Sequence, residues 1–421
     1  MKVQQKKIFK ITLASGFGTL FEWYDFLLYA IATGLVFNKL FFPTTDPTIG
    51  ILLSMLTFGV GYVARPVGGI LFGHFGDRIG RKSMLMFTMV LMGVSTFAIG
   101  LLPTYESVGI WAPIMLVCLR ILQGLSFGGE WAGGSLMILE HAPVNRRGFY
   151  ASFVQIGYPL GFLLATGIFA LVLKLSGSAF LEWAWRIPFL FSIFLIAFGI
   201  FIRSKLPETP VFEKIQKNKS VSRFPFLDIL KNEKKPLFLG IGIKVTEIAW
   251  AYLLSVFFPL WAVNNLGLNR ADVMDVILIA VACTTIVIPL SGYISDIIGR
   301  RKIYIFTSIL FGLLAYPIWA SLAAGNIFWP IVVGIISSTI MLAPLAALLP
   351  ELFRPETRYS GAGATNQIAA AIGGGIVPVV GTWLAVTTGH LSGIAILMII
   401  LSLITLVCSL LIKETYRKKL I

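Results

Sequence analysis

The sequence predicts an all-α integral membrane protein with twelve transmembrane helices in two pseudo-symmetric six-helix bundles. Three observations lead to this prediction. Hydrophobic residues make up 57% of the chain and charged ones 13%, with a mean hydropathy of +0.88, whereas typical soluble domains are about 45–50% apolar and about 25% charged. The apolar residues form runs of roughly 20 residues, the length of helix that crosses about 30 Å of hydrocarbon. A polar motif also occurs at corresponding places in the two halves.

The apolar runs predict about twelve spans. The run after the basic segment Met1–Lys10 is too long for the core of a signal peptide and carries Glu22 and Asp25, so we interpret it as the first retained helix. The predicted spans are 11–37, 49–72, 83–103, 111–140, 149–173, 185–203, 237–263, 273–293, 303–323, 328–350, 360–386 and 392–412.

The net charge of +15 has a topological origin. About 27 of the 34 Lys and Arg residues fall in the two tails and in the loops at 73–83, 142–148, 203–236, 299–302 and 351–358. Cytoplasmic loops carry such an excess of cations. We therefore expect a multi-pass protein of the cell (plasma or inner) membrane with both termini in the cytoplasm, and no nucleic-acid partner. The cations expected elsewhere are Lys39, Lys174, Arg186 and Arg270 on the other side and Arg65, Arg120 and Lys244 within spans.

One polar stretch divides the chain. Residues 203–236 are rich in Lys, Ser, Asn and Asp and separate six predicted helices from six. We therefore expect an N-terminal bundle at 1–202, a cytoplasmic linker at 203–236 and a C-terminal bundle at 237–421.

A ten-residue motif is repeated between predicted spans. Gly73–Lys82 reads Gly-His-Phe-Gly-Asp-Arg-Ile-Gly-Arg-Lys, and Gly292–Arg301 reads Gly-Tyr-Ile-Ser-Asp-Ile-Ile-Gly-Arg-Arg. Both fit Gly-x3-Asp-x2-Gly-Arg-[Lys/Arg], and the offset of 219 is close to half of the 421 residues. This predicts an internal duplication. A short, charged, glycine-hinged turn at the same place in two apolar halves favours a transporter over an enzyme with one active site.

Further segments carry a family resemblance. Glu140-x6-Arg147 matches Glu351-x6-Arg358 at an offset of 211. With the twelve spans and the repeated motif, the whole chain resembles the major facilitator superfamily. Within it, the chain is similar to the metabolite:proton symporter family, and it resembles the shikimate-type members most. The segments that carry this finer resemblance are Glu22-Trp-Tyr-Asp-Phe26, Arg65-Pro-Val-Gly-Gly69 with Phe72-Gly-His74, Gln123-Gly-Leu-Ser-Phe-Gly-Gly-Glu-Trp131, Trp185-Arg-Ile-Pro-Phe189, Glu208-Thr-Pro-Val-Phe212 and Leu349-Pro-Glu-Leu-Phe353.

The repeated motifs predict a gate on the cytoplasmic side. An aspartate there can accept hydrogen bonds from the N-terminus of a neighbouring helix or pair with an arginine, and glycine permits positive φ and close backbone approach. The alternative is ordinary connecting loops. The resemblance implies two gate networks, made by Asp77, Arg81, Glu140 and Arg147 and by Asp296, Arg300, Glu351 and Arg358.

Acids within spans are the candidates for proton coupling, because ionisable groups in a membrane usually face a cavity or a partner. Glu22 and Asp25 are three residues apart and share one helix face. Their mutual repulsion makes one of them a plausible proton acceptor, unless the pair is interfacial. Glu130 and Glu247 are the further candidates.

Arg120 is the principal candidate for substrate binding. It lies near the middle of the fourth span with Gln123 on the same side, and its guanidinium can bind a carboxylate through two hydrogen bonds. The alternative is a structural salt bridge to Glu130 or to the first helix. Lys244 and Glu247 either pair with each other or line the cavity, with Lys244 as a second carboxylate anchor. Polar and aromatic residues of other spans are further candidates for the pocket, with packing as the alternative: Tyr24, Trp131, Gln155, Tyr158, Asn366 and Gln367.

These observations disfavour other function classes. Cys118, Cys283 and Cys408 lack zinc or disulfide spacing, and the three histidines lie at predicted loops or helix ends, so we expect no metal site or catalytic triad. No Gly-x4-Gly-Lys-[Ser/Thr] motif is present. We therefore expect no cofactor and no enzyme, but a monomeric proton-coupled symporter that imports a small organic acid by alternating access. The alternatives are import of a zwitterion such as proline or betaine, and uniport or efflux.

Overall fold

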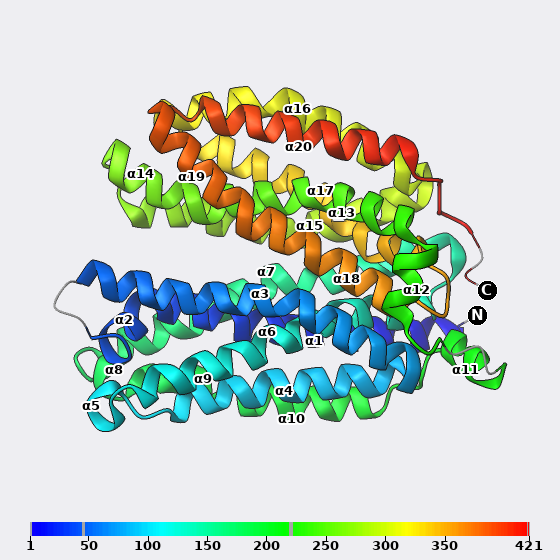
Figure 1. Ribbon diagram of the computed structural model, residues 1–421, viewed down its shortest axis with the longest axis horizontal. Coiled ribbons are helices and arrows are strands. Elements are labelled where there is room, and N and C mark those ends of the chain that lie inside the picture. Colours follow the sequence, from blue (N-terminus) through cyan, green and yellow to red (C-terminus); the bar gives the residue numbers. More distant parts are fainter. Residues whose placement is uncertain (1, 44–46, 219–221, 419, 421) are drawn as a thin grey trace.

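The computed structural model describes residues 2–43, 47–218, 222–418 and 420. Within these residues the chain is helical, without strands, and its long helices form two bundles (Figure 1). The helices of the first bundle are α1 (Lys2–Ala32), α3 (Pro47–Ile79), α4 (Arg81–Leu101), α6 (Trp111–Leu139), α7 (Arg147–Ser176) and α10 (Ser192–Ser204).

The second bundle repeats this arrangement. Its long helices are α13 (Lys234–Tyr252) continued by α14 (Phe258–Leu266), α15 (Arg270–Ile298), α16 (Arg300–Ala323), α17 (Phe328–Glu351), α18 (Arg358–Ala370) continued by α19 (Val377–Thr388), and α20 (Ser392–Leu411). The short elements are α2 (Asn38–Leu40), α5 (Tyr105–Val108), α8 (Ala179–Glu182), α9 (Ile187–Leu190), α11 (Pro210–Lys217), α12 (Pro225–Asn232) and the 3-10 turns Val144–Arg146 and Ala184–Arg186.

The fold class is confirmed. Twelve helical segments of the described residues are long and apolar enough to cross a membrane, and each overlaps one predicted span. Mean hydropathy therefore found every span, although most ends differ by a few residues.

A duplication in helix geometry escaped the sequence reading. π-helical turns at Thr33–Phe37 and Leu253–Phe257 interrupt the first helix of each bundle, and a third at Ala371–Ile376 joins α18 to α19. Such turns are common at functional sites. The first two have no distinctive composition, so periodicity could not reveal them, whereas the third contains the glycines Gly373–Gly375.

The turns between α3 and α4 and between α15 and α16 are shorter than expected. We predicted turns over the whole motifs, but α3 continues to Ile79 and α15 to Ile298. Only Gly80 (φ 129°) and Gly299 (φ 103°) break the helices. These backbone angles disfavour residues with a side chain, so the glycine hinge is confirmed and the length of the turn is corrected.

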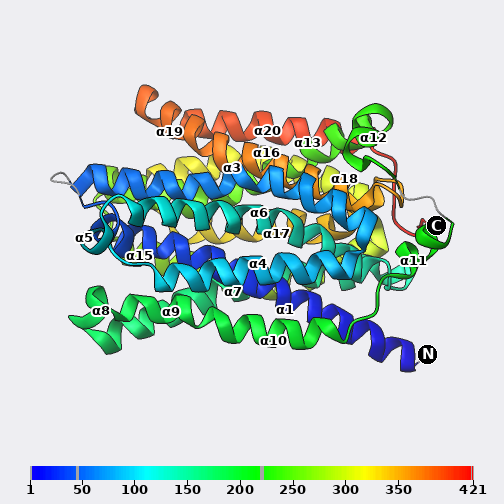
Figure 2. The ribbon, with the colours of Figure 1, turned by 60° about the horizontal axis from the view of Figure 1, so that its bottom comes forward.

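The bundles meet along a few helix pairs. α7 packs against α15 and α17, and α18 packs against α3. Small residues permit close approach: a Cβ on Gly292 of α15 would lie 2.6 Å from the carbonyl oxygen of Gly148 in α7. Figure 2 shows the long helices of both bundles running in the same general direction.

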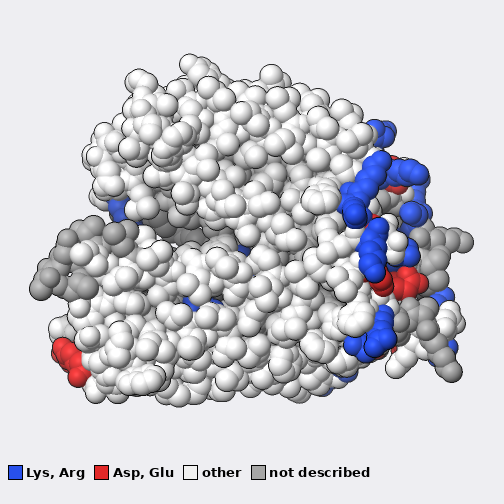
Figure 3. Space-filling view, viewed as in Figure 1, with Lys and Arg blue, Asp and Glu red and all other residues white. Residues whose placement is uncertain are grey.

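Lys and Arg side chains gather at one end of the molecule, which we call the basic end (Figure 3). The two chain termini, α11 and α12 lie at this end, while α5, α8 and α14 lie at the other (Figure 1). The predicted linker 203–236 thus contains two short helices at the basic end. Away from this end, the surface in Figure 3 is hollowed along the boundary between the bundles.

Candidate transport site and basic-end network

Two aspartates join the bundles at the basic end. The Asp77 carboxylate, near the end of α3, accepts hydrogen bonds from the backbone N–H groups of Tyr359 (3.1 Å) and Ser360 (2.9 Å) at the start of α18. The Asp296 carboxylate, near the end of α15, accepts hydrogen bonds from Gly148 and Phe149 (both 2.8 Å) at the start of α7. Each aspartate therefore caps a helix of the other bundle, where its charge is favourable.

The first glycine of each motif makes room for this capping. A Cβ on Gly73 would lie 2.7 Å from the Cα of Ser360. The corresponding Cβ on Gly292 would lie 2.7 Å from the Ser152 side chain and closer still to Gly148. A larger residue at either position would push the capped helix away from the aspartate.

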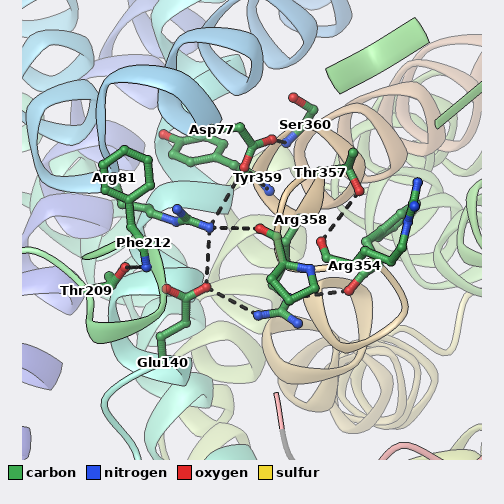
Figure 4. Close-up of polar contacts among 12 residues, drawn as sticks. Asp77, Arg81, Glu140, Thr209, Phe212, Arg354, Thr357, Arg358, Tyr359 and Ser360 are labelled. Atoms are coloured by element: carbon green, nitrogen blue, oxygen red, sulfur yellow. Dashed lines mark hydrogen bonds and ion pairs between the residues drawn. The ribbon is translucent and has the colours of Figure 1, made fainter. Parts of the chain in front are cut away.

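Side chains add a second layer of contacts in the first network (Figure 4). Glu140, just after α6, forms ion pairs with Arg81 (3.5 Å) in its own bundle and with Arg358 (3.4 Å) in the other. Arg81 also donates to the carbonyl of Pro355 (3.1 Å). These side chains are almost fully buried, so water screens the charges little.

The second network differs in its side chains. Arg300 forms ion pairs with Asp296 (2.8 Å) and Glu351 (3.5 Å), both in its own bundle. Glu351 accepts a hydrogen bond from the Thr415 hydroxyl (2.6 Å), and Arg147 donates to the carbonyl of Lys418 (2.6 Å). The predicted membership is thus corrected: Arg358 pairs with Glu140 in the first network, and Arg147 lies in the second. Among the described residues, Glu351 thus has no ion pair to the other bundle.

Sequence reasoning missed a third duplicated pair at this end. Glu208 accepts from the backbone N–H of Lys82 (3.2 Å) at the start of α4. Glu414 accepts from Arg300 (3.0 Å) and Arg301 (3.1 Å) at the start of α16. Both glutamates precede a threonine and follow the last helix of a bundle, so the Glu-Thr repeat was the available signal.

A further contact ties the linker to the second bundle. Arg354 pairs with Glu233, which also accepts from the Thr357 hydroxyl (3.0 Å). The hydrogen bond to Glu233 raises the pKa of the Arg354 guanidinium. Neither residue was singled out from the sequence, because one Glu among many linker charges has no distinctive pattern.

Within the first bundle, Glu130 of α6 is paired. Arg203, which we counted among the loop cations, is buried in the last turn of α10 and forms a two-point ion pair with Glu130. The Thr88 hydroxyl also donates to Glu130 (3.0 Å). The placement of Arg203 in the loop is thus corrected, since a span boundary drawn from hydropathy cannot show that the last cation turns inward.

Glu22 and Asp25 of α1 lie beside this pair. They line a cavity of about 10 Å³, together with residues that include Thr88, Ser126 and Glu130, which is room for about one water molecule. Both carboxyl groups are buried, and neither Glu22 oxygen has a hydrogen-bond partner among the described residues. The pair is therefore not interfacial but deep in the bundle.

A chain of polar groups leads from Asp25 to Arg120. Asp25 accepts from the Ser192 hydroxyl (2.7 Å), and the Thr96 side chain lies near it. The Thr96 hydroxyl itself donates to the carbonyl of Met92 (3.0 Å). The Thr96 oxygen accepts from the Gln123 amide (2.8 Å), and Gln123 in turn accepts from Arg120 Nη1 (3.1 Å). The expectation that Arg120 and Gln123 point the same way is thus confirmed.

Arg120 is a buried cation without a carboxylate partner. No ion pair of Arg120 occurs among the described residues, and its Nε and Nη2 atoms lack hydrogen-bond partners. Instead its guanidinium lies over the rings of Phe26 (4.1 Å) and Tyr29 (4.2 Å). Such cation–π contacts stabilise the charge but leave the N–H edge free.

In the second bundle, Lys244 and Glu247 pair with each other. Lys244 Nζ lies 2.5 Å from Glu247 Oε2, and both side chains are buried on α13. Of the two arrangements left open by the sequence, pairing is the one observed.

The remaining candidates occupy different positions. The Tyr24 hydroxyl donates to the carbonyl of Pro188 (2.8 Å) inside the first bundle, so we correct its assignment and remove it from the pocket. Trp131 donates to Gln155 (3.1 Å), whose amide donates across the bundles to the carbonyl of Leu342 (3.1 Å).

Two further polar residues come from α18. Gln367 donates across the boundary to the carbonyls of Phe127 (3.3 Å) and Gly128 (3.4 Å). The buried side-chain oxygens of Asn366 and Gln367 have no hydrogen-bond partner within the described part of the chain. Tyr158 packs edge-on against Trp23, with ring centroids 4.8 Å apart. Gln367 thus lies at the boundary between the bundles.

Comparisons with known proteins agree with this architecture. The profile described as Sugar (and other) transporter matches residues 11–224, and the profile described as Major Facilitator Superfamily matches residues 245–420. The shikimate transporter of Escherichia coli (strain K12) is 38% identical over 97% of this chain and 95% of its own length. The proline/betaine transporter of the same organism is 31% identical over 99% of this chain and 86% of its own length.

The fold also has solved counterparts. A structure of the proton:xylose symporter XylE bound to 6-bromo-6-deoxy-D-glucose matches with a TM-score of 0.79 at 18% identity, covering 99% of this chain and 98% of the other. The helices, the buried charges and these relatives define a membrane transporter and not an enzyme. The chain belongs to the major facilitator superfamily, among the metabolite transporters that the sequence motifs indicated.

Proposed function

We propose that this transporter is a symporter that imports a small organic carboxylate together with protons. The observation that carries the proposal is the polar chain Asp25–Thr96–Gln123–Arg120. Hydrogen bonds join Thr96 to Gln123 and Gln123 to Arg120, and Thr96 lies near Asp25. Neither the buried acid nor the buried cation has an ion-pair partner among the described residues.

The coupling follows from charge balance. Besides the Glu130–Arg203 pair, the interior of the first bundle holds two acids, Glu22 and Asp25, and two cations, Arg65 and Arg120. When an acid takes up a proton, one positive charge is left without compensation in a low dielectric, which is unfavourable. An anionic substrate restores the balance, so protonation and carboxylate binding favour each other.

Asp25 is the proposed proton acceptor, with Glu22 as its neighbour. Glu130 is a weaker candidate than the sequence indicated, because its two-point pair with Arg203 stabilises the charged carboxylate. Glu247 is likewise held by Lys244.

The basic-end networks would act as the gate. The caps made by Asp77 and Asp296 exist only while the bundles are close at this end, so opening it requires breaking both. We propose that this end faces the cytoplasm and that both termini lie inside the cell, because Lys and Arg side chains gather at this end (Figure 3). The bundles then rock about the site between them.

The substrate class rests on the arginine and on the relatives. A guanidinium without a partner suits a carboxylate, and the relative with 38% identity is a shikimate transporter. A hydroxylated or aromatic monocarboxylate is therefore the preferred class. The proline/betaine relative keeps zwitterions as the second candidate.

Uptake by proteoliposomes tests the proposal. The panel contains labelled shikimate, benzoate, 2-oxoglutarate, citrate, proline and glycine betaine, each with and without an inward acid gradient. We expect one carboxylate to accumulate with the gradient and to be released by a protonophore. Accumulation of proline or betaine alone would replace the substrate class, and uptake insensitive to the gradient and to protonophore would reject symport.

The Asp25→Asn variant tests the proton acceptor. We expect substrate exchange between the two sides to persist while gradient-driven accumulation is lost, because Asn cannot carry the proton. Asp275→Asn, at an exposed position on α15, is the matched control and should accumulate substrate as the unaltered protein does. Normal accumulation by Asp25→Asn would remove Asp25 from this role.

A further inference from the structure

Arg65 is a second buried cation, and aromatic rings cover it. The residue is 2% exposed and lies near the middle of α3. Its Cζ atom lies 3.7 Å from the ring centroid of Phe127, 4.0 Å from that of Phe26 and 4.3 Å from that of Tyr62. These contacts stabilise the charge of a desolvated guanidinium through its flat faces.

The edge of the Arg65 guanidinium remains unpaired. Its Nε and Nη2 atoms have no hydrogen-bond partner, and no ion pair of Arg65 occurs among the described residues. These two N–H groups form one side of the guanidinium fork, with the spacing of two carboxylate oxygens. Leaving them buried and unpaired is costly, so the site favours an acceptor with two oxygens.

A neighbour of Arg65 on α3 reaches the boundary between the bundles. Tyr62, three residues before Arg65, shares a hydrogen bond with Tyr252 of α13 in the other bundle. Pro66 follows directly and lacks the N–H that would bond to the Tyr62 carbonyl in a regular helix. The polar groups beside Arg65 thus belong to a contact that joins α3 to α13.

Arg120 differs from Arg65 in how firmly it is held. Its Nη1 donates to Gln123, and a Cβ on Gly61 of α3 would lie 2.5 Å from its Nε. Its fork therefore faces the backbone of α3 in this conformation. The Cζ atoms of Arg65 and Arg120 lie 4.0 and 4.1 Å from the centroid of the same Phe26 ring. A change of charge near one guanidinium therefore alters the electrostatic energy of the other.

We propose that Arg65 is the residue that receives the substrate carboxylate, through its Nε and Nη2 edge, while Arg120 links the filled site to Asp25. This inference rests on the proposed function and names the anchor of that same site. The pair Tyr62–Tyr252 closes the site toward the end opposite to the basic end. The ligand is a carboxylate whose two oxygens lie in the plane of the guanidinium.

Two kinds of variant test the anchor on the purified full-length protein. Arg65→Lys keeps the charge but loses the two-point fork, and Arg65→Gln loses both. The probes are labelled shikimate and benzoate, with methyl shikimate and methyl benzoate as competitors. Arg223→Gln, at an exposed position in the linker, is the matched control, and size-exclusion profiles and thermal unfolding show that each variant is folded.

We expect Arg65→Lys to weaken binding about 10-fold or more and Arg65→Gln to abolish it, because hydrogen bonds to charged groups carry such discrimination. The methyl esters should not compete, and Arg223→Gln should bind normally. Equal binding by the unaltered protein, Arg65→Lys and Arg65→Gln would overturn the anchor while leaving carboxylate transport intact.

Chemical protection of arginine separates the anchor from the proposed function. Phenylglyoxal modifies guanidinium groups when they are accessible, which for the buried Arg65 requires the opening of the site during alternating access, and mass spectrometry locates the modified residues. We expect modification of Arg65 that 20 mM benzoate suppresses, while the paired Arg203 stays unmodified. If the uptake panel shows no carboxylate transport, protected Arg65 still supports an anion site. Arg65 that benzoate does not protect, or that never reacts, contradicts it.

Discussion

The two bundles are alike at the basic end and unlike in the interior. At the basic end, Asp77 and Asp296 each cap a helix of the opposite bundle through two backbone N–H groups. In the interior, the first bundle holds Glu22, Asp25, Arg65 and Arg120 without ion pairs among the described residues, whereas the charges of α13 in the second bundle form the pair Lys244–Glu247.

This difference separates two tasks of the molecule. A gate that closes by bringing two bundles together benefits from equal contacts on both sides of the axis. Proton and anion binding need groups whose charge is not already compensated. We therefore propose that both bundles form the gate and that proton and anion binding take place in the first bundle.

The largest expected effect concerns the pair on α13. Lys244→Met leaves Glu247 buried without a partner, which we expect to cost about 3–5 kcal/mol of stability. The double variant Lys244→Met with Glu247→Leu should recover most of this loss, measured as thermal unfolding of the purified protein. It should also retain uptake. A stable double variant without uptake would show that the second bundle also contributes chemistry.

The next effect concerns the two caps. Because each carboxylate accepts two hydrogen bonds, Asp77→Asn and Asp296→Asn should each destabilise the closed basic end by about 2–3 kcal/mol. The double variant should destabilise the closed basic end by about the sum of the two single effects. Distances between spin labels at Val144 and Lys302 report the opening. If the populations of the open state in the two single variants differ by much more than about threefold, the two bundles are not equivalent at this end.

A smaller effect distinguishes the two gate glutamates. Glu140 pairs with an arginine of each bundle, whereas Glu351 pairs within its own. Glu140→Gln should therefore favour opening by about 1–2 kcal/mol, and Glu351→Gln by less. The same labels measure both. A larger effect of Glu351→Gln would show that its long-range attraction to Arg147 matters more than contact geometry.

The smallest effect concerns the glycine hinges. Gly80→Ala and Gly299→Ala place a side chain at positive φ, which costs about 1 kcal/mol, and each new Cβ would approach Glu208 or Glu414. We expect equal losses of thermal stability in the two variants. A loss in one variant alone would mean that only one turn needs this conformation.

The sequence predicted the parts of the fold that depend on composition and repetition. Twelve apolar runs identified the spans, and the offset of 219 located both capping aspartates. Hydropathy could not show that α3 and α15 stay helical through their motifs, because a polar helical turn at a membrane surface has the composition of a loop.

The interior was predictable only in part. Acids and arginines within spans are conspicuous, so Asp25 and Arg120 could be singled out as candidates from the sequence. The hydrogen-bond and ion-pair partners of such residues depend on how the helices face each other, which the sequence does not show. Arg203 was assigned to a loop although it pairs with Glu130. Tyr24 was expected in the pocket although its hydroxyl bonds to Pro188. Neither contact has a local pattern, since the partners are 73 and 164 residues apart.

Proton uptake on substrate binding tests the central claim, that the first bundle holds both the proton acceptor and the anion site. The purified protein is mixed in weak buffer with the carboxylate identified by the uptake panel, and a pH indicator records the protons bound. We predict about one proton per carboxylate, unchanged in the double variant Lys244→Met with Glu247→Leu and absent in Asp25→Asn. Proton uptake that survives in Asp25→Asn and disappears in the double variant would contradict the account.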